Sequence, residues 1–324
     1  MMKKARLALL LSLLLAPVLL LVWVQQPLVF PRASVLPAAV DGAALRQHVE
    51  VLSQDLVPRD HDHPENLDRA AAYIREHFEA AGSRVEEQPY QADGKTYRNV
   101  ILRLGPTEGE AIVLGAHYDA YDVYPAADDN ASGVAALLEL ARLLADQELQ
   151  RPLHLVAYTL EEPPYFRTQN MGSAVHARSL GAAGAEVAFM ISIEMIGYFS
   201  DQPGSQTYPS PLIARLYPTT GNFIAVVGRF RDGFLVRRIK ASLGSASDLP
   251  VVSMNAPANL VRGLDFSDHL NYWHQGFPGL MVTDTSFYRN FAYHTEGDTA
   301  DRLDYGRMAE VVAGLHQVVL DHQD

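Results

Sequence analysis

The sequence predicts an α/β fold class: a single domain with a mostly parallel central sheet that helices flank on both faces. Short apolar runs typical of strands alternate along the chain with segments in which apolar residues recur every three or four positions, as in helices. The length of 324 residues allows one large domain or two modest ones, and the chain shows no internal repeats. Because the two patterns alternate throughout, one sheet with crossover helices is the most economical arrangement.

The expected helices and strands follow one another at short intervals. Helix patterns over residues 41–56 and 65–81 come first, and Gly82 is expected to end the second. Later helix patterns cover residues 132–144, where leucines form the apolar face, and residues 305–320. The strand-like runs cover residues 97–102, 111–115, 153–160, 186–193, 222–227 and 279–283.

Composition excludes several classes of protein. The formal net charge is −12, which argues against a nucleic-acid partner, because nucleic-acid binders normally present a basic face to the phosphates. Hydrophobic residues make up 48% of the chain and charged residues 20%, so wholesale disorder is excluded. The chain has no cysteine, which excludes disulfide scaffolds, thiolate zinc sites and cysteine nucleophiles. Any bound metal ion must therefore be held by His, Asp and Glu.

The N-terminus carries a basic flank followed by an apolar segment. Lys3, Lys4 and Arg6 precede residues 7–24, which are almost entirely apolar. At about 1.5 Å per residue, such a helix reaches the lower limit for crossing a bilayer. The alternative is a cleaved signal peptide, whose apolar core is usually about 7–15 residues long and is followed by small residues at the cleavage site. The apolar run here is longer and no good cleavage site follows it, so a retained anchor is favoured.

This segment sets the expected domain organisation and location. Residues 1–24 are expected to be a membrane anchor or signal, residues 25–40 a linker with three prolines, and residues 41–324 the folded domain. A basic flank tends to stay in the cytoplasm. The domain is therefore expected on the extracytoplasmic side, periplasmic or extracellular, and attached to the membrane through its N-terminal segment. Secretion after signal cleavage is the alternative.

Side chains that can bind metal ions stand where the expected strands end. In open α/β sheets, ligands bind beyond the carboxyl ends of the strands. Each side chain alone has an ordinary explanation: aspartates before a helix can cap it, and adjacent glutamates are often only solvated. A carboxylate that closes an apolar strand would be costly to bury without a partner. The residues are His117 with Asp119, Asp128 with Asp129, Glu161 with Glu162, Glu194, and His294.

Two imidazoles and three carboxylates among these residues form a ligand set suited to zinc. Five protein ligands are too many for one catalytic zinc ion, which usually keeps three ligands and an open position. They suit two ions about 3.5–4 Å apart that share one carboxylate. The five are His117, Asp129, Glu162, Glu194 and His294.

With these motifs the chain resembles the co-catalytic dinuclear zinc peptidase family, which includes bacterial leucyl aminopeptidases, glutamate carboxypeptidases and glutaminyl cyclases. The resemblance covers residues 41–324 and implies a fold of the zinc-peptidase (phosphorylase/hydrolase-like) type. The matching motifs are His117-Tyr118-Asp119, the run from Asp128 to Gly133, Glu161-Glu162, Glu194 at a strand end, and Tyr293-His294-Thr295.

The resemblance implies a role for each residue. His117 and Glu194 would hold one zinc ion, Glu162 and His294 the other, and Asp129 would bridge the two. Glu161 would be the general base, and Asp119 would lie behind His117 and hold its orientation. A cis peptide is implied between Asp129 and Asn130. The segment Ser267-Asp268-His269 would support the site from behind, and His269 is not expected to be a ligand.

The implied activity is that of a metal-dependent exopeptidase, most directly an aminopeptidase that hydrolyses N-terminal residues of peptides with two zinc ions per chain. The alternatives are a glutaminyl cyclase-like acyltransferase, typically with one zinc ion, and a non-catalytic ectodomain of the same fold. The chain departs from the family pattern at Glu194, where many relatives have Asp, and in a longer link after Glu162. The aromatic residues Tyr165, Phe166, Tyr198, Phe199, Phe266 and Trp273 could line a substrate pocket or pack in the core.

Overall fold

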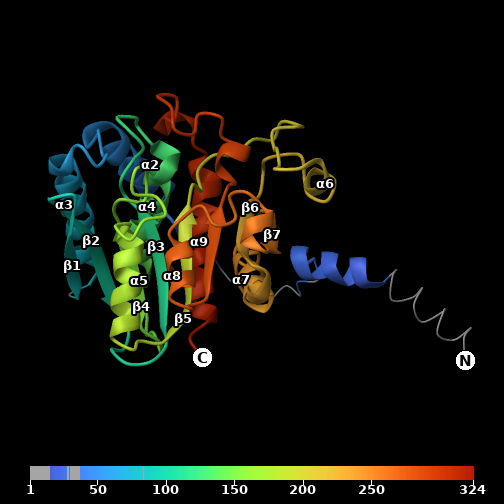
Figure 1. Ribbon diagram of the computed structural model, residues 1–324, viewed down its shortest axis with the longest axis horizontal. Coiled ribbons are helices and arrows are strands. Elements are labelled where there is room, and N and C mark those ends of the chain that lie inside the picture. Colours follow the sequence, from blue (N-terminus) through green and yellow to red (C-terminus); the bar gives the residue numbers. More distant parts are fainter. Residues whose placement is uncertain (1–14, 28, 30–36, 83) are drawn as a thin grey trace, which may run out of the picture.

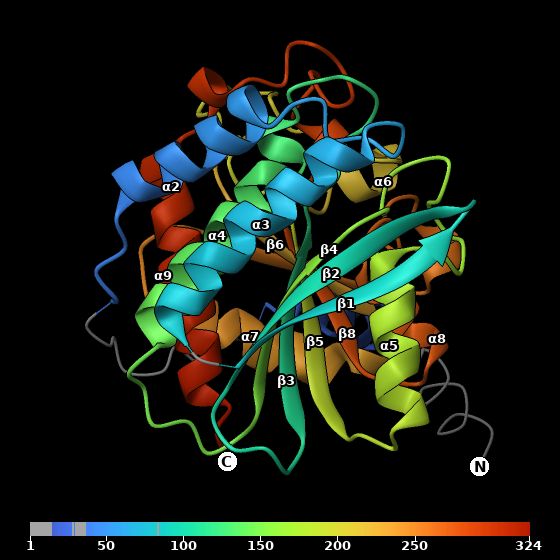
Figure 2. The ribbon, with the colours of Figure 1, turned by 90° about the vertical axis from the view of Figure 1, so that its left-hand side faces the viewer.

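One eight-stranded sheet runs through the part of the chain that the computed structural model describes, namely residues 15–27, 29, 37–82 and 84–324. The strand order is β1-β2-β4-β3-β5-β8-β6-β7, and helices cover both faces (Figure 1, Figure 2). This confirms the predicted α/β class. The strands are β1 (Val85–Ala92), β2 (Lys95–Leu104), β3 (Ala111–His117), β4 (Leu153–Tyr158), β5 (Val187–Glu194), β6 (Ile224–Arg229), β7 (Val251–Ala256) and β8 (Gly279–Thr283).

The four central strands of the sheet are parallel. β3 pairs in parallel with β4 and β5, and β5 pairs in parallel with β8. The antiparallel pairs lie toward the edges: β1 with β2, β2 with β4, and β6 with β8, while β6 and β7 are parallel to each other. The carboxyl ends of β3, β4, β5 and β8 therefore lie at one edge of the sheet.

Helices form a layer on each face of this sheet. Figure 2 shows α2, α3, α4 and α9 on one face, and α5 and α8 on the other. A π-helical turn, Val51–Asp55, extends α2 over the remainder of the first predicted helix. The helices are α2 (Gly42–Glu50), α3 (Pro64–Ala81), α4 (Gly133–Leu144), α5 (Gly172–Ala182), α6 (Pro211–Ala214), α7 (Gly233–Leu243), α8 (His269–His274) and α9 (Tyr305–Asp321).

The central strands are buried on both faces, which is why they read as continuous apolar runs in the sequence. Successive residues of β3 point to opposite sides. Ile112 and Leu114 join the larger core beneath α2, α3, α4 and α9, whereas Val113 joins the smaller core beneath α5 and α8. Both faces of the central strands are thus held in place.

Several elements do not show in the sequence patterns. β1 is an edge strand that contains Pro89 and is mostly half-exposed, so it has no apolar run. β7 lies at the opposite edge of the sheet and is likewise incompletely buried. The helices α5, α6, α7 and α8 also lie outside the four predicted helices. Edge strands bury only one face, which weakens the hydrophobic signal that reveals central strands.

The predicted N-terminal anchor is only partly covered by the structure. Residues 15–25 are helical, whereas residues 7–14 of the apolar segment lie outside the described residues. Among the described residues, no helix is both long and apolar enough to cross a membrane. The assignment of residues 1–24 as an anchor or signal stays a prediction.

Candidate metal and catalytic site

The residues predicted as ligands meet at the carboxyl edge of the parallel strands. His117 is the last residue of β3 and Glu194 the last residue of β5. Glu162 follows β4, Asp129 lies in the turn before α4, and His294 lies beyond β8. All except His294 are buried. Five residues that are spread between positions 117 and 294 of the chain thus meet at one site.

The ligand atoms form two groups that share one carboxylate. Nε2 of His117 lies 3.3 Å from Oδ1 of Asp129 and 3.5 Å from Oε2 of Glu194. Nε2 of His294 lies 3.1 Å from Oδ2 of Asp129 and 3.1 Å from Oε1 of Glu162. Asp129 therefore offers one oxygen atom to each group, in the arrangement that the ligand set predicts.

The chemistry of the two groups fits bound cations. Nε2 of His117 is buried and forms no hydrogen bond, although carboxylate oxygens surround it. Burial, together with the neighbouring Asp129 carboxylate, raises the pKa of Glu162 to about 8. The carboxylates of Asp129, Glu162 and Glu194 cannot all be ionised in a buried site unless positive charge compensates them. Imidazole and carboxylate groups are the donors that zinc accepts in cysteine-free sites.

The turn that presents Asp129 is held on both sides. Its peptide bond to Asn130 is cis, as the resemblance implies. Asn130 donates from Nδ2 to the carbonyl of Ile193 at 2.8 Å, which ties the turn to the end of β5. Gly133 leaves room for this contact, because a Cβ there would lie 2.4 Å from Oδ1 of Asn130. The backbone N–H of Asp129 donates to the Asp298 carboxylate at 3.0 Å.

Asp119 contacts both the first histidine and the glutamate pair. Its carboxylate accepts hydrogen bonds from the backbone N–H groups of Glu161 and Glu162, at 3.1 and 3.0 Å. Nδ1 of His117 lies 3.1 Å from the Asp119 carbonyl oxygen and 3.5 Å from its Oδ1. Asp119 therefore lies where it can orient His117, and it also positions the glutamate pair, which the sequence does not reveal.

Glu161 faces the site outside the two groups around Asp129, and with His117 and Glu162 it forms a third group of side chains close enough together to hold an ion. Its Oε2 lies 4.0 Å from Nε2 of His117, and its side chain lines the adjoining cavity. Burial raises the pKa of Glu161 well above its ordinary value; His117 lowers it and Glu162 raises it further. A carboxylate with a raised pKa at the edge of a cavity is suited to accept and return a proton.

A cavity of about 290 Å³ opens next to the ligand groups. Asp129, Glu161, Glu162, Glu194 and His294 are among the residues that line it. Of the aromatic residues considered from the sequence, Phe166 and Phe266 line the cavity, whereas the others are not part of its wall. The remaining aromatic lining residues were not apparent from the sequence and are Tyr208, Tyr217, Phe223, Phe287, Tyr288 and Tyr293.

Residues 99–319, most of the folded domain, match the profile of peptidase family M28. The chain belongs to peptidase family M28. Over 317 residues it is 48% identical to the uncharacterized protein YfbL of Escherichia coli (strain K12), covering 94% of this chain and 97% of that protein. It is 25% identical to leucine aminopeptidase 1 of Coccidioides posadasii (strain C735), over 65% of this chain. The chain spans about half, 52%, of the length of that relative.

Solved structures share the fold of this M28 domain. BSAP, a zinc aminopeptidase from Bacillus subtilis, superposes with a TM-score of 0.68 at 12% identity, over 86% of this chain and 94% of that one. Porphyromonas gingivalis glutaminyl cyclase superposes with a TM-score of 0.66 at 18% identity, over 86% of this chain and 98% of that one. These likenesses confirm the fold class, and the match to the family profile confirms the family expected from the motifs.

The structure adds a buried arginine that supports the candidate site. Arg59 is fully buried and donates to the carbonyls of Tyr118 and Ala126, at 3.0 and 3.1 Å, so it joins the segments that carry His117 and Asp129. No periodic pattern in the sequence marks Arg59.

The segment expected behind the site lies there. Ser267 donates to Oε2 of Glu194 at 2.6 Å. His269 is buried with its Nε2 2.9 Å from the Leu264 carbonyl, and it takes no part in the two ligand groups.

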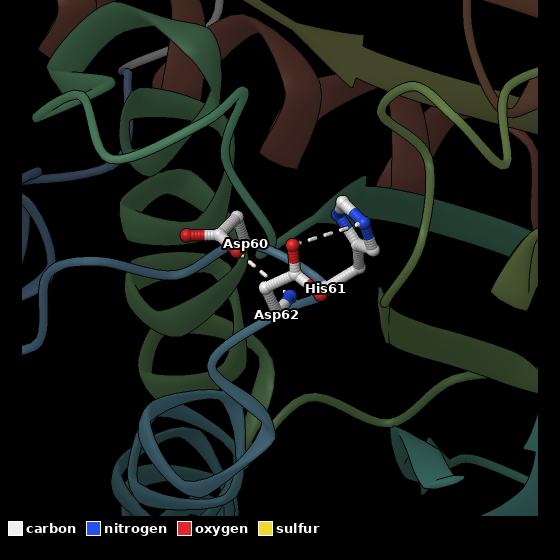
Figure 3. A group of neighbouring side chains, drawn as sticks. All are labelled: Asp60, His61 and Asp62. Carbon is white, nitrogen blue, oxygen red and sulfur yellow. Dashed lines mark hydrogen bonds and ion pairs between the residues drawn. The ribbon is translucent and has the colours of Figure 1, made fainter. Parts of the chain in front are cut away.

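Away from this site, the described residues contain another cluster of side chains that could bind a metal ion, Asp60, His61 and Asp62 in the turn before α3 (Figure 3). The Asp60 carboxylate accepts from the backbone N–H of Asp62 and contacts Nδ1 of His63, both at 2.7 Å. Nε2 of His61 lies 3.6 Å from Oδ2 of Asp62. The hydrogen bonds of the turn itself account for this arrangement, as is common for aspartates in turns.

Proposed function

We propose that this M28 peptidase is a two-zinc aminopeptidase that removes N-terminal residues from peptides. The observation that carries the proposal is the position of Asp129 between two histidine–carboxylate groups, beside a cavity that Glu161 lines. His117 and Glu194 would hold one ion, Glu162 and His294 the other, and Asp129 both. The aminopeptidase relatives in the family support the same activity.

In this mechanism Glu161 moves the proton. When bound, two zinc ions supply Lewis acidity, which lowers the pKa of water and polarises a peptide carbonyl. Glu161 accepts the proton of the attacking water and then gives it to the leaving amine. Asp119 holds the backbone of Glu161 in place throughout, through the hydrogen bond at 3.1 Å. The aromatic walls of the cavity favour peptides whose terminal side chain is apolar.

A glutaminyl cyclase-like acyl transfer is the second candidate, because a glutaminyl cyclase shares the fold. The two activities make different demands on the site. A single-zinc cyclase does not require a carboxylate that serves two ions, whereas the two oxygens of Asp129 face different histidines here. The ligand geometry therefore favours the peptidase.

Metal content and substrate choice test this function together. The purified full chain is expected to bind two zinc ions after reconstitution, as counted by elemental analysis, and to release residues from aminoacyl peptides. N-blocked peptides should stay intact, because an aminopeptidase requires a free terminus. One ion per chain with cyclisation of glutaminyl peptides would favour the cyclase. No turnover of any substrate by the zinc-loaded protein would favour the non-catalytic ectodomain.

We also propose that the N-terminal segment is retained and holds the domain at the extracytoplasmic face of a membrane. The basic flank at Lys3, Lys4 and Arg6 and the apolar run after it support this orientation. Protease added to spheroplasts should then degrade the domain. A domain that is degraded only after the cells are lysed would contradict the orientation.

A further inference from the structure

The residues at the end of the N-terminal helix (residues 15–25) are hydrogen-bonded to α7 and to β7, an edge strand of the sheet. Gln26 is fully buried, and its Oε1 accepts a hydrogen bond from Arg237 of α7 at 2.6 Å. The Gln25 carbonyl accepts from Ser253 of β7 at 2.7 Å and from Lys240 of α7 at 3.2 Å. Gln25 and Gln26 fall in the predicted linker. Their contacts fix the direction in which the helix leaves the domain.

Trp23 strengthens this attachment one turn earlier. Its indole N–H donates to the Phe230 carbonyl at 2.9 Å, and its ring meets that of Phe234 edge-on at 5.0 Å between centroids. The indole also lies directly on the backbone of Gly233, where a Cβ would come within 2.7 Å of it. The helix therefore projects from the domain on the side that carries α6 and α7, as Figure 1 shows in blue.

The same side exposes large apolar side chains around the helix. Phe234 is 67% exposed although it touches Trp23, and Leu212 of α6 is 68% exposed. Phe230 and Leu216 are also exposed, and they lie at the two places where Trp23 and Gln25 bind the domain. We call Leu212, Leu216, Phe230 and Phe234 the α6–α7 face. It continues the exposed apolar surface of the helix, which includes Leu15, Val18 and Leu19.

Basic side chains accompany this apolar face in a chain that is acidic as a whole. The run from Arg229 to Lys240 contains five basic residues and one acidic residue, Asp232. Arg231 and Arg238 in this run are exposed, and so is Arg215 beside α6. Aromatic and apolar side chains flanked by arginine and lysine are typical of surfaces that enter the headgroup region of a bilayer containing anionic lipids.

We propose that the α6–α7 face docks on an anionic lipid bilayer around the point where the N-terminal helix enters it. The proposal rests on the retained N-terminal segment, and it adds that the domain itself contacts the lipid. The rigid connection through Trp23, Gln25 and Gln26 sets the tilt of the domain. Ser253, which lines the cavity, donates to the Gln25 carbonyl, and Tyr217, which also lines it, follows Leu216, whose carbonyl accepts from Gln25. The cavity therefore lies close to the lipid surface, where apolar peptides concentrate.

Because the chain has no cysteine, a single introduced cysteine can report the docking. The full-length protein with Phe234→Cys, labelled with an environment-sensitive fluorophore, is placed in nanodiscs that contain phosphatidylglycerol and nitroxide lipids. The matched control is Ala80→Cys, because Ala80 is exposed on α3, which packs on β1 and β2 at the opposite edge of the sheet from β7 (Figure 1). We expect strong quenching at position 234 and little at position 80. Quenching at 234 should weaken in Arg231→Gln/Arg238→Gln protein.

Three results would overturn the proposal, and a fourth would refute the membrane location on which it rests. If the protein binds the nanodiscs but shows no quenching at position 234, the N-terminal segment anchors it and the α6–α7 face does not contact the lipid. Equal quenching at positions 234 and 80 means that the domain has no preferred orientation. Burial of the 234 probe in detergent together with the mass of a dimer assigns the face to a second copy of the chain. Protein that fails to associate with any nanodisc refutes the membrane location proposed above.

Discussion

Glutamine in place of Glu161 is expected to lower turnover by about 10²–10⁴-fold while both zinc ions stay bound. The substitution keeps the size of the side chain and leaves the two ligand groups around Asp129 intact. It removes the carboxylate that we assign to the proton transfer. The measurement is the rate of release of the N-terminal residue, with metal content determined on the same sample.

The adjacent Glu162 supplies a matched comparison. Its Oε1 lies 3.1 Å from Nε2 of His294, so Glu162→Gln replaces an anionic ligand with a weaker neutral one. Occupancy of one metal site should fall, and excess zinc should restore part of the activity. If Glu161→Gln loses metal and Glu162→Gln keeps both ions, the two roles are reversed. If neither substitution changes turnover, the catalytic assignment is wrong.

Alanine in place of Arg59 is expected to lower the free energy of unfolding by about 3–5 kcal/mol. The guanidinium group is fully buried, and it is surrounded by carbonyl oxygens and by the negative charges of Asp119 and Asp298. Its removal leaves the carbonyls of Tyr118 and Ala126 without this donor and leaves the carboxylates without compensation. Urea unfolding of the full chain, followed by circular dichroism, measures the loss.

Arg46→Ala is the control for this experiment. Arg46 is exposed on α2 and pairs with Glu50 one turn further along, at 2.7 Å. Exposed pairs of this kind contribute little to stability, so the control should unfold close to the wild type. Equal unfolding midpoints for the two variants would show that Arg59 does not hold the segments of His117 and Asp129 together.

The central parallel strands and the residues after them could be predicted from the sequence. β3 and β5 are buried on both faces, so each appears as an apolar run that stops at a polar residue, His117 or Glu194. The parallel arrangement then brings these residues to one edge without further information. By contrast, β1 and β7 lie at the edges of the sheet and carry no comparable apolar run.

The sequence by itself determined the fold class, the family and the set of metal-type residues, because each of them follows from a local pattern of a few neighbouring positions. Only the tertiary structure decided the contacts between distant segments. Asp119 reaches the backbone of Glu161 across 42 positions, and Arg59 reaches Ala126 across 67. Trp23 reaches Phe230 across 207. A hydrogen bond between distant segments leaves no periodicity in either one, since it depends on how the whole chain packs.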